Sequence, residues 1–222
     1  MAESRLTTTY GEFLLMAYWS VAEPGEHLAI IKGTFPLREP VLVRLHSQCL
    51  TGEVLGSLQC DCGEQLHEAF SAIKSKSSGV LLYLPQEGRG IGLVNKIRAY
   101  ALQEKGVDTV EANIKLGFAP DQRHYGVAAG ILKDLGIRSV RLLTNNPDKI
   151  QGLEQHGVQV CARVPIITSA NGKNNFYLAA KQKRLGHLFG ITGVEPSEVE
   201  SANGVAENIS DGIPATLGTA VK

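Results

Sequence analysis

Apolar and polar positions alternate along the chain in a pattern that predicts interleaved strands and helices. Between residues 27 and 46, the segments HLAIIKG and VLVRLHS are rich in β-branched residues and predict two strands. The run GVLLYLP (79–85) is short, apolar and ended by proline, which predicts a buried strand. SVRLLTNN (139–146) reads as a strand that runs into a turn, and VQVCARVPI (158–166) alternates as a strand does.

Other segments carry apolar residues at helical spacing. In GEQLHEAFSAIKS (63–75), Leu66, Phe70 and Ile73 fall on one side. Helices are also predicted over 92–106, 121–135, 148–157 and 173–189. Strands and helices that interleave in this way favour an α/β (α+β) fold with a mixed β-sheet flanked by helices.

Composition divides the chain near residue 190. Residues 190–222 contain no aromatic residue and hold five acidic residues and one lysine, a local charge of −4, and we expect them to form a disordered tail. The total charge is zero, so residues 1–189, the expected folded domain, carry +4. This excess is compatible with an anionic substrate but does not identify one.

Bulk properties argue against several partners. Zero net charge and 6% aromatic residues give no basic stripe interleaved with aromatics, so we expect no nucleic-acid partner. No apolar run approaches membrane-spanning length, so no membrane partner is expected. Because no secretory signal is visible and three of the four cysteines are clustered, metal ligation is favoured over disulfides, and the cytoplasm is the default compartment.

The strongest local signal is the spacing C-x10-C-x-C formed by Cys49, Cys60 and Cys62. Thiolates are soft ligands that usually take zinc, and three protein ligands with an open position are typical of a catalytic zinc site. Buried or redox-active thiols are the alternative interpretation. His46 and Cys161 are candidates for a fourth ligand, although the strand alternation around Cys161 predicts a core residue.

Three further segments carry candidate anion-handling or acid–base groups. QEGRGIG (86–92) places glycines and an arginine between a strand and a helix, where backbone N–H groups can approach an anion. LTNNPDKI ends a strand and brings Lys149, although Asn145 or Asn146 before Pro147 also suits a helix cap. In GFAPDQRHYG, Asp121 and Arg123 have the simpler interpretation of a helix cap and a solvated side chain.

Together these segments resemble the GTP cyclohydrolase II family. The resemblance runs through RLHSQCLTGE, GSLQCDCGEQL, YLPQEGRGIGLVNKIRAYALQEKGVDTVEAN, KLGFAPDQRHYG and RLLTNNPDKI and ends near KRLGHLF, so it covers nearly all of residues 8–189. It implies zinc-dependent hydrolysis of GTP to 2,5-diamino-6-(5-phosphoribosylamino)pyrimidin-4(3H)-one, formate and pyrophosphate, the first step of riboflavin biosynthesis. It also implies one Zn²⁺ per subunit, Mg²⁺ with the triphosphate, and a homodimer.

The resemblance assigns a role to each matching position. It makes Cys49, Cys60 and Cys62 the zinc ligands. It makes Asp121 the proton acceptor, Arg123 the nucleophile, and Tyr100 a residue of the ring-opening step. The implied GTP site consists of Arg44, Leu45, His46, Ser47, Gln48, Gln65, Glu87, Gly88, Arg89, Thr109, Thr144 and Lys149.

Simple chemistry refines these roles. An arginine stays protonated because its pKa exceeds about 12, so stabilising charge on the phosphoryl group suits Arg123 better than nucleophilic attack. Gln65 and Glu87 are hypothesised to pair with the guanine edge, and Arg44, Arg89 and Lys149 to neutralise the triphosphate.

Two positions depart from the family pattern, which usually has acidic residues where this chain has Gln48 and His124. They motivate one alternative, a divergent paralogue with a changed product or nucleotide. A second alternative, from another class, is a non-catalytic protein that zinc stabilises and that binds a nucleotide.

Overall fold

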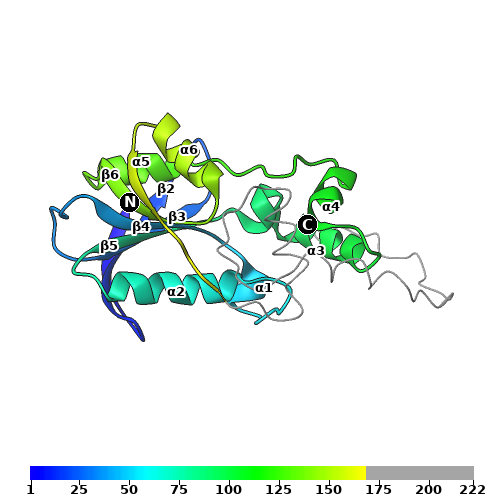
Figure 1. The fold of residues 1–222 in the computed structure, drawn as a ribbon, viewed down its shortest axis with the longest axis horizontal. Coiled ribbons are helices and arrows are strands. Elements are labelled where there is room, and N and C mark those ends of the chain that lie inside the picture. Colours follow the sequence, from blue (N-terminus) through cyan, green and yellow to red (C-terminus); the bar gives the residue numbers. More distant parts are fainter. Residues whose placement is uncertain (169–222) are drawn as a thin grey trace. The chain divides into compact units, whose positions relative to one another are not determined.

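The computed structural model describes residues 1–168, and the strands of this part of the chain form one mixed seven-stranded sheet (Figure 1). The strand order is β1-β2-β3-β5-β4-β6-β7. β1 to β3 form an antiparallel meander that joins β5 antiparallel, whereas β5, β4, β6 and β7 run parallel to one another. The strands are β1 Ala2–Thr8, β2 Gly11–Trp19, β3 Glu26–Lys32, β4 Val41–Ser47, β5 Gly79–Leu84, β6 Ser139–Leu143 and β7 Gln159–Val164.

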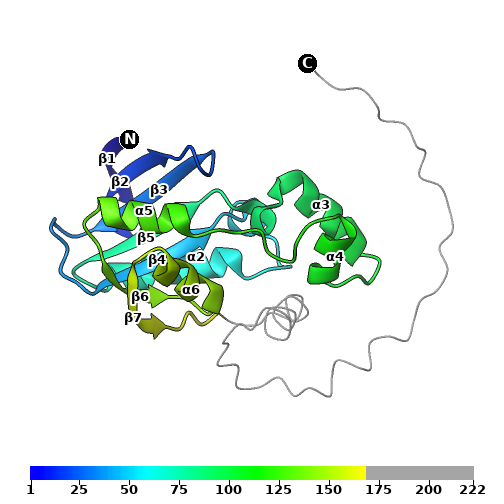
Figure 2. The same ribbon diagram turned by 90° about the horizontal axis from the view of Figure 1, so that it is seen from above.

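Helices cover both faces of the sheet. α2 lies on one face and α5 and α6 lie on the other, while α3 and α4 lie beyond the carboxyl ends of β4 and β5 (Figures 1 and 2). The helices are α1 Leu50–Glu53, α2 Cys62–Lys74, the short 3-10 helix η1 Glu87–Gly90, α3 Gly92–Gln103, α4 Thr109–Lys115, α5 Gly126–Asp134 and α6 Pro147–Gln155.

The core has one apolar cluster on each face of the sheet, because alternate side chains of a strand point to opposite faces. Val43 and Leu45 of β4 pack with α5 and α6, and Leu42 packs with α2. Arg44 and His46 share the face of Leu42 and are also buried. β4 therefore carries polar side chains inward as it approaches its carboxyl end.

The fold confirms the predicted α/β class, and an element begins or ends within a few residues of most predicted bounds. One helix is shorter than predicted: α5 begins at Gly126, not at residue 121. Residues 121–125 form a loop because Asp121 accepts a hydrogen bond from the backbone N–H of Arg123 (3.0 Å), and the N–H of Gln122 donates to the carbonyl of Arg89 (3.0 Å). The hairpin β1–β2 and the short helices α1 and α4 were not predicted.

The prediction that Cys161 is a core residue is wrong. Its side chain is exposed, because β7 is the edge strand of the sheet and neither of its faces is fully covered. The predicted helix 173–189, the expected tail 190–222 and the boundary between them lie outside the described residues. Within the described residues, no helix has the length and apolar character needed to cross a membrane.

Candidate active site at the carboxyl ends of the parallel strands

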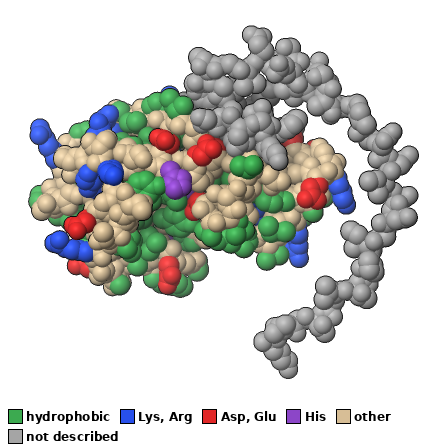
Figure 3. Space-filling model, turned by 90° about the horizontal axis from the view of Figure 1, so that it is seen from below, with side chains coloured by type: hydrophobic (Ala, Val, Ile, Leu, Met, Phe, Trp, Pro, Cys, Tyr) green, Lys and Arg blue, Asp and Glu red, His purple; other side chains and the backbone are tan. Residues whose placement is uncertain are grey.

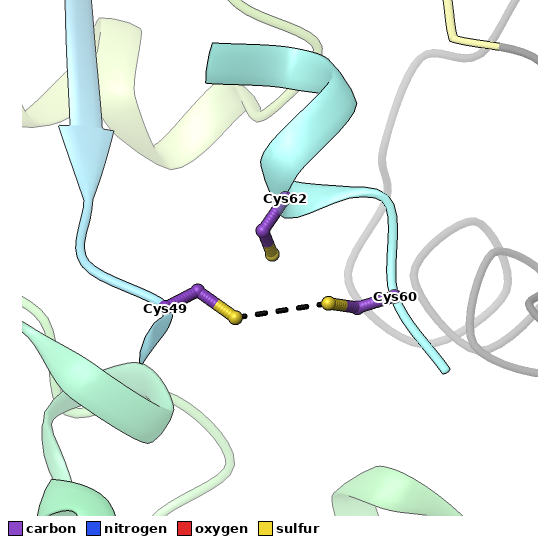
Figure 4. A group of neighbouring side chains, drawn as sticks. All are labelled: Cys49, Cys60 and Cys62. Atoms are coloured by element: carbon purple, nitrogen blue, oxygen red, sulfur yellow. Dashed lines mark hydrogen bonds between the residues drawn. The ribbon is translucent and has the colours of Figure 1, made fainter. Parts of the chain in front are cut away.

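Three thiols from two segments meet beyond the end of β4. Cys49 directly follows β4, and Cys60 and Cys62 lie at the start of α2 (Figure 4). Their sulfur atoms all lie within 4.8 Å of one another, and those of Cys49 and Cys60 are 3.7 Å apart. Two Zn–S bonds of about 2.3 Å at a tetrahedral angle place their sulfurs about 3.8 Å apart. The three thiols therefore fit a zinc ion in donor type and in spacing.

Gly52 of α1 leaves the room that this cluster needs. A Cβ atom at Gly52 would lie 2.6 Å from the sulfur of Cys60 and 3.3 Å from that of Cys49. Ordinary contacts of a Cβ atom are 3.4–4 Å, so a side chain here would push into the sulfurs. The backbone of α1 thus forms one wall of a cradle whose size matches the three thiols.

Two carboxylates hold the backbone of the first thiol. Glu53 accepts a hydrogen bond from the N–H of Cys49 (2.8 Å), and Glu87 accepts one from the N–H of Leu50 (2.7 Å). Such partners fix the direction of a ligand, as outer-shell groups do in metal sites. Glu87 was expected at the site from the sequence, whereas Glu53 was not.

His46 belongs to the carboxylate network and not to the thiol cluster. Its Nε2 atom bonds to Glu53 (2.8 Å), which also accepts a hydrogen bond from Tyr83 (2.6 Å). Burial lowers the pKa of His46 to about 4, although the bond to Glu53 opposes this shift. The group of side chains that could hold a metal includes neither His46 nor Cys161 among the described residues, so neither fourth-ligand candidate is supported.

A cavity lies beside the thiols. It opens where the parallel strands end, the place where ligands bind in open α/β sheets. Eleven of the residues assigned from the sequence line it: Ser47, Gln48, Cys49, Cys60, Cys62, Glu87, Gly88, Arg89, Tyr100, Thr109 and Arg123.

Arg89, which lines this cavity, is unusual in its backbone conformation and in the hydrogen bonding of its side chain. Its φ angle of 62° lies in the left-handed region, which is uncommon for a residue other than glycine and costs roughly 1–2 kcal/mol. Its two terminal guanidinium nitrogens are buried and have no hydrogen-bond partner among the described residues. Leaving buried N–H groups without an acceptor costs free energy, and an anionic ligand in the cavity would supply acceptors for this guanidinium.

Tyr100 reaches the thiol cluster through Thr51. Its hydroxyl lies 3.2 Å from the hydroxyl of Thr51, which in turn lies 3.7 Å from the sulfur of Cys49. Burial raises the pKa of Tyr100, so its phenol is a proton donor or a neutral hydrogen-bonding group near neutral pH.

Arg123 joins this cavity to a second one that Asp121 and His124 also line. Asp121 and Arg123 form an ion pair with several hydrogen bonds, so neither is simply a helix cap or a solvated side chain. Burial alone would raise the pKa of Asp121, but the hydrogen bonds and charge of Arg123 outweigh it and lower the pKa below its usual value. Asp121 is therefore ionised at neutral pH.

Six other assigned residues do not line this cavity: Gln65 is half-buried, and the buried ones are Arg44, Leu45, His46, Thr144 and Lys149. Arg44 donates to the carbonyl of Leu143 (3.0 Å) and to Gln65 (2.6 Å), which itself donates to Asp61 (2.5 Å). Burial lowers the pKa of Arg44 to about 10, so it remains a cation at neutral pH.

Lys149 connects α6 to the end of β4, because its buried ammonium group donates to the carbonyl of Leu45 (2.7 Å). Thr144 accepts a hydrogen bond from the N–H of Asn146 (3.0 Å), and Asn146 caps α6 with Pro147 in its first turn. Of the two candidates that the sequence offers for this cap, Asn145 and Asn146, the structure shows Asn146.

Fold and site together define an α/β protein with a thiol-rich candidate metal centre beside a ligand cavity. A family model described as GTP cyclohydrolase II matches residues 1–165, and the chain belongs to this family. It is 55% identical over 190 residues to the riboflavin biosynthesis protein RibBA of Bacillus cereus, covering 86% of this chain and 48% of that protein. The RibBA of Chlorobium phaeovibrioides is 53% identical over 186 residues, covering 84% of this chain and 45% of that protein.

The chain thus spans about half the length of these curated relatives. A structural likeness with a TM-score of 0.41 and 20% identity covers 76% of this chain and 40% of RibBX, a two domain 3,4-dihydroxy-2-butanone 4-phosphate synthase from A. baumannii. This overlap is too loose to support a conclusion about the present chain.

Proposed function

We propose that the chain is a zinc-dependent GTP cyclohydrolase II. It would convert GTP to 2,5-diamino-6-(5-phosphoribosylamino)pyrimidin-4(3H)-one, formate and pyrophosphate, the first step of riboflavin biosynthesis. The observation that supports this most is the meeting of three thiols with Arg89, Tyr100 and Arg123 at one cavity. The family match and the names of the relatives agree with it.

The thiols would hold Zn²⁺, which supplies Lewis-acid chemistry that makes water nucleophilic near neutral pH. In a GTP complex the reacting end of guanine would lie near the sulfurs and the phosphates near Arg89 and Arg123, which line the same cavity. Gln65 and Glu87 remain the candidates for the guanine edge, although each already has hydrogen bonds inside the protein. A GTP complex would therefore require these side chains to share or exchange partners.

Phosphate handling would fall to cations around the cavity. The unpaired guanidinium of Arg89 would bind phosphate oxygens, and Mg²⁺ would bridge the triphosphate. Arg123 would stabilise charge on the phosphoryl group, since its pairing with ionised Asp121 keeps it protonated. The same pairing keeps Asp121 ionised, the state that a proton acceptor requires, while it lowers the basicity of the carboxylate.

The test follows formate, pyrophosphate and the pyrimidine together after purified protein is mixed with GTP, Mg²⁺ and Zn²⁺. We expect equal amounts of formate and pyrophosphate, and neither from the variant Cys60→Ser. Cys161→Ser is the matched control, because Cys161 is exposed and separate from the cluster, and it should keep full activity.

The divergent-paralogue alternative has one structural observation in its favour, since Gln48 lines the cavity where the family usually has a carboxylate. It would yield a partial or altered product, such as pyrophosphate without formate. A non-catalytic nucleotide-binding protein would yield neither product from any guanine nucleotide and would unfold when zinc is removed.

A homodimer is proposed from the family resemblance, and α3 supports it. Leu93, Val94 and Ile97 expose apolar side chains on this helix, and apolar side chains also gather between charged ones on the face in Figure 3. Exposed apolar patches often mark interfaces between proteins. Sedimentation should give twice the chain mass, and Val94→Asp with Ile97→Asp should give the monomer.

A cytoplasmic location stays a prediction.

A further inference from the structure

Lys96 is a buried cation at the thiol cluster. It lies on α3, and only 8% of its surface is exposed. Its ammonium nitrogen lies 3.1 Å from the sulfur of Cys49 and 2.7 Å from a carboxylate oxygen of Glu87. It also lies 5.7 Å from the ring centre of Tyr100. One side chain thus touches a thiol, the loop before α3 and the tyrosine of the cavity.

A simple ion pair with Glu87 does not account for this placement. Taking a lysine out of water is costly unless charge and hydrogen bonds compensate it. Glu87 already accepts hydrogen bonds from the N–H groups of Leu50 (2.7 Å) and Gly88 (3.1 Å), so its own oxygens are not short of donors. The ammonium group points toward the sulfur as well, at a distance suitable for an N–H to sulfur hydrogen bond.

The contact between Lys96 and the sulfur of Cys49 would balance the negative charge of a metal-loaded site. Three thiolates around a divalent cation leave one negative charge, and Glu87 adds another beside it. A cation in contact with a ligand sulfur offsets part of this excess and withdraws electron density from that sulfur. The metal then keeps more of its Lewis acidity than it would in an uncompensated site of three thiolates.

We propose that Lys96 is a positioning residue that donates a hydrogen bond to the sulfur of Cys49 in the metal-loaded protein and ties it to Glu87. This inference rests on the metal site of the proposed function. Lys96 acts on the metal through its ligand, and it orients the loop that carries Arg89 through Glu87.

The test uses the full chain loaded with Co²⁺ in place of Zn²⁺, because thiolate-to-cobalt charge-transfer bands report on the sulfur. Removing a hydrogen bond raises the energy of the sulfur electrons, so these bands should move to longer wavelength in Lys96→Met. Lys115→Met is the matched control, since Lys115 is half-exposed and pairs with Glu111 on the surface of α4. Its cobalt spectrum should equal that of the wild type.

Kinetics with zinc give a second readout. Disturbing a group that orients a metal ligand typically costs about 10–100-fold in activity or metal affinity. We expect Lys96→Met to lose kcat by a factor in this range, with a smaller change in KM for GTP. Lys96→Arg, which retains the charge, should recover part of kcat and most of the spectrum.

Lys96→Gln serves where Lys96→Met does not fold, because its amide is neutral but can still donate to Glu87. The same shift to longer wavelength is expected. An unchanged spectrum in folded, cobalt-loaded Lys96→Met or Lys96→Gln would overturn the role of Lys96 and leave the proposed function standing. Failure of the wild type to bind cobalt or zinc at the three thiols would overturn the metal site itself, and this inference with it.

Discussion

Replacing Gly52 by alanine should weaken metal binding while the fold survives. The added Cβ would lie 2.6 Å from the sulfur of Cys60, so helix α1 or that sulfur must move by about 0.8 Å to reach the shortest ordinary contact of 3.4 Å. Metal–sulfur bond lengths vary by only about 0.2 Å, so a shift of this size removes or misdirects a ligand. We expect zinc affinity to fall by at least about 10–100-fold, the loss typical of disturbing a group that orients a ligand.

Backbone strain does not explain such a loss, because Gly52 lies in a helix, where alanine is favoured over glycine by about 1 kcal/mol. The matched control is Gly130→Ala in α5, where an added Cβ meets no atom within 4 Å. This variant should keep its zinc and gain up to about 1 kcal/mol of unfolding free energy.

The assay for both variants is competition with a zinc chelator, together with far-ultraviolet circular dichroism of the metal-free proteins. Wild-type zinc affinity in a folded Gly52→Ala variant would refute the cradle. Loss of helical signal in that variant without metal would show that the glycine supports the fold and not the site.

The other predictions concern stability. Gly152→Ala should lower the unfolding free energy by about 1–3 kcal/mol, because its Cβ would lie 2.7 Å from the ring of Tyr125, and thermal unfolding would show an unchanged midpoint if this packing is loose. Asp121→Asn should lower the unfolding free energy at pH values above the usual carboxyl pKa of 3.8. In the wild type this contribution should be lost as pH falls through the lower pKa that Arg123 gives to Asp121. A difference in unfolding free energy between variant and wild type that does not depend on pH would contradict this. Burial lowers the pKa of His46 from 6.5 to about 4, so the unfolded chain binds more protons than the folded chain between these pH values. The unfolding free energy should therefore decline as pH falls through this range, and it should decline less steeply in His46→Asn. Urea titrations that give the same pH dependence for both proteins would exclude this contribution.

Sequence patterns predicted those elements whose structure depends on residues within the element itself. The spacing of Leu66, Phe70 and Ile73 predicted α2, and the cap at Asn146 with Pro147 predicted the start of α6. Patterns failed where the partner is distant. The alternation at Cys161 suggested burial, but burial of a strand residue requires a neighbour on that face, and β7 lies at the edge of the sheet.

In the candidate site, too, the sequence predicted what depends on local spacing and did not predict what depends on distant packing. The spacing of three cysteines indicates a metal, since the chemistry of thiols limits what such a group can do. No spacing marks Lys96 or Glu53, because a lysine in the middle of a helix and a glutamate at the end of one are ordinary surface residues in a sequence. Their burial beside Cys49 arises only when α3 and α1 pack at the end of β4. Thiolates confined in a buried site need nearby cations and fixed N–H groups, so a cysteine cluster of this kind in a single sequence predicts that an unidentified lysine or arginine will be found folded against it.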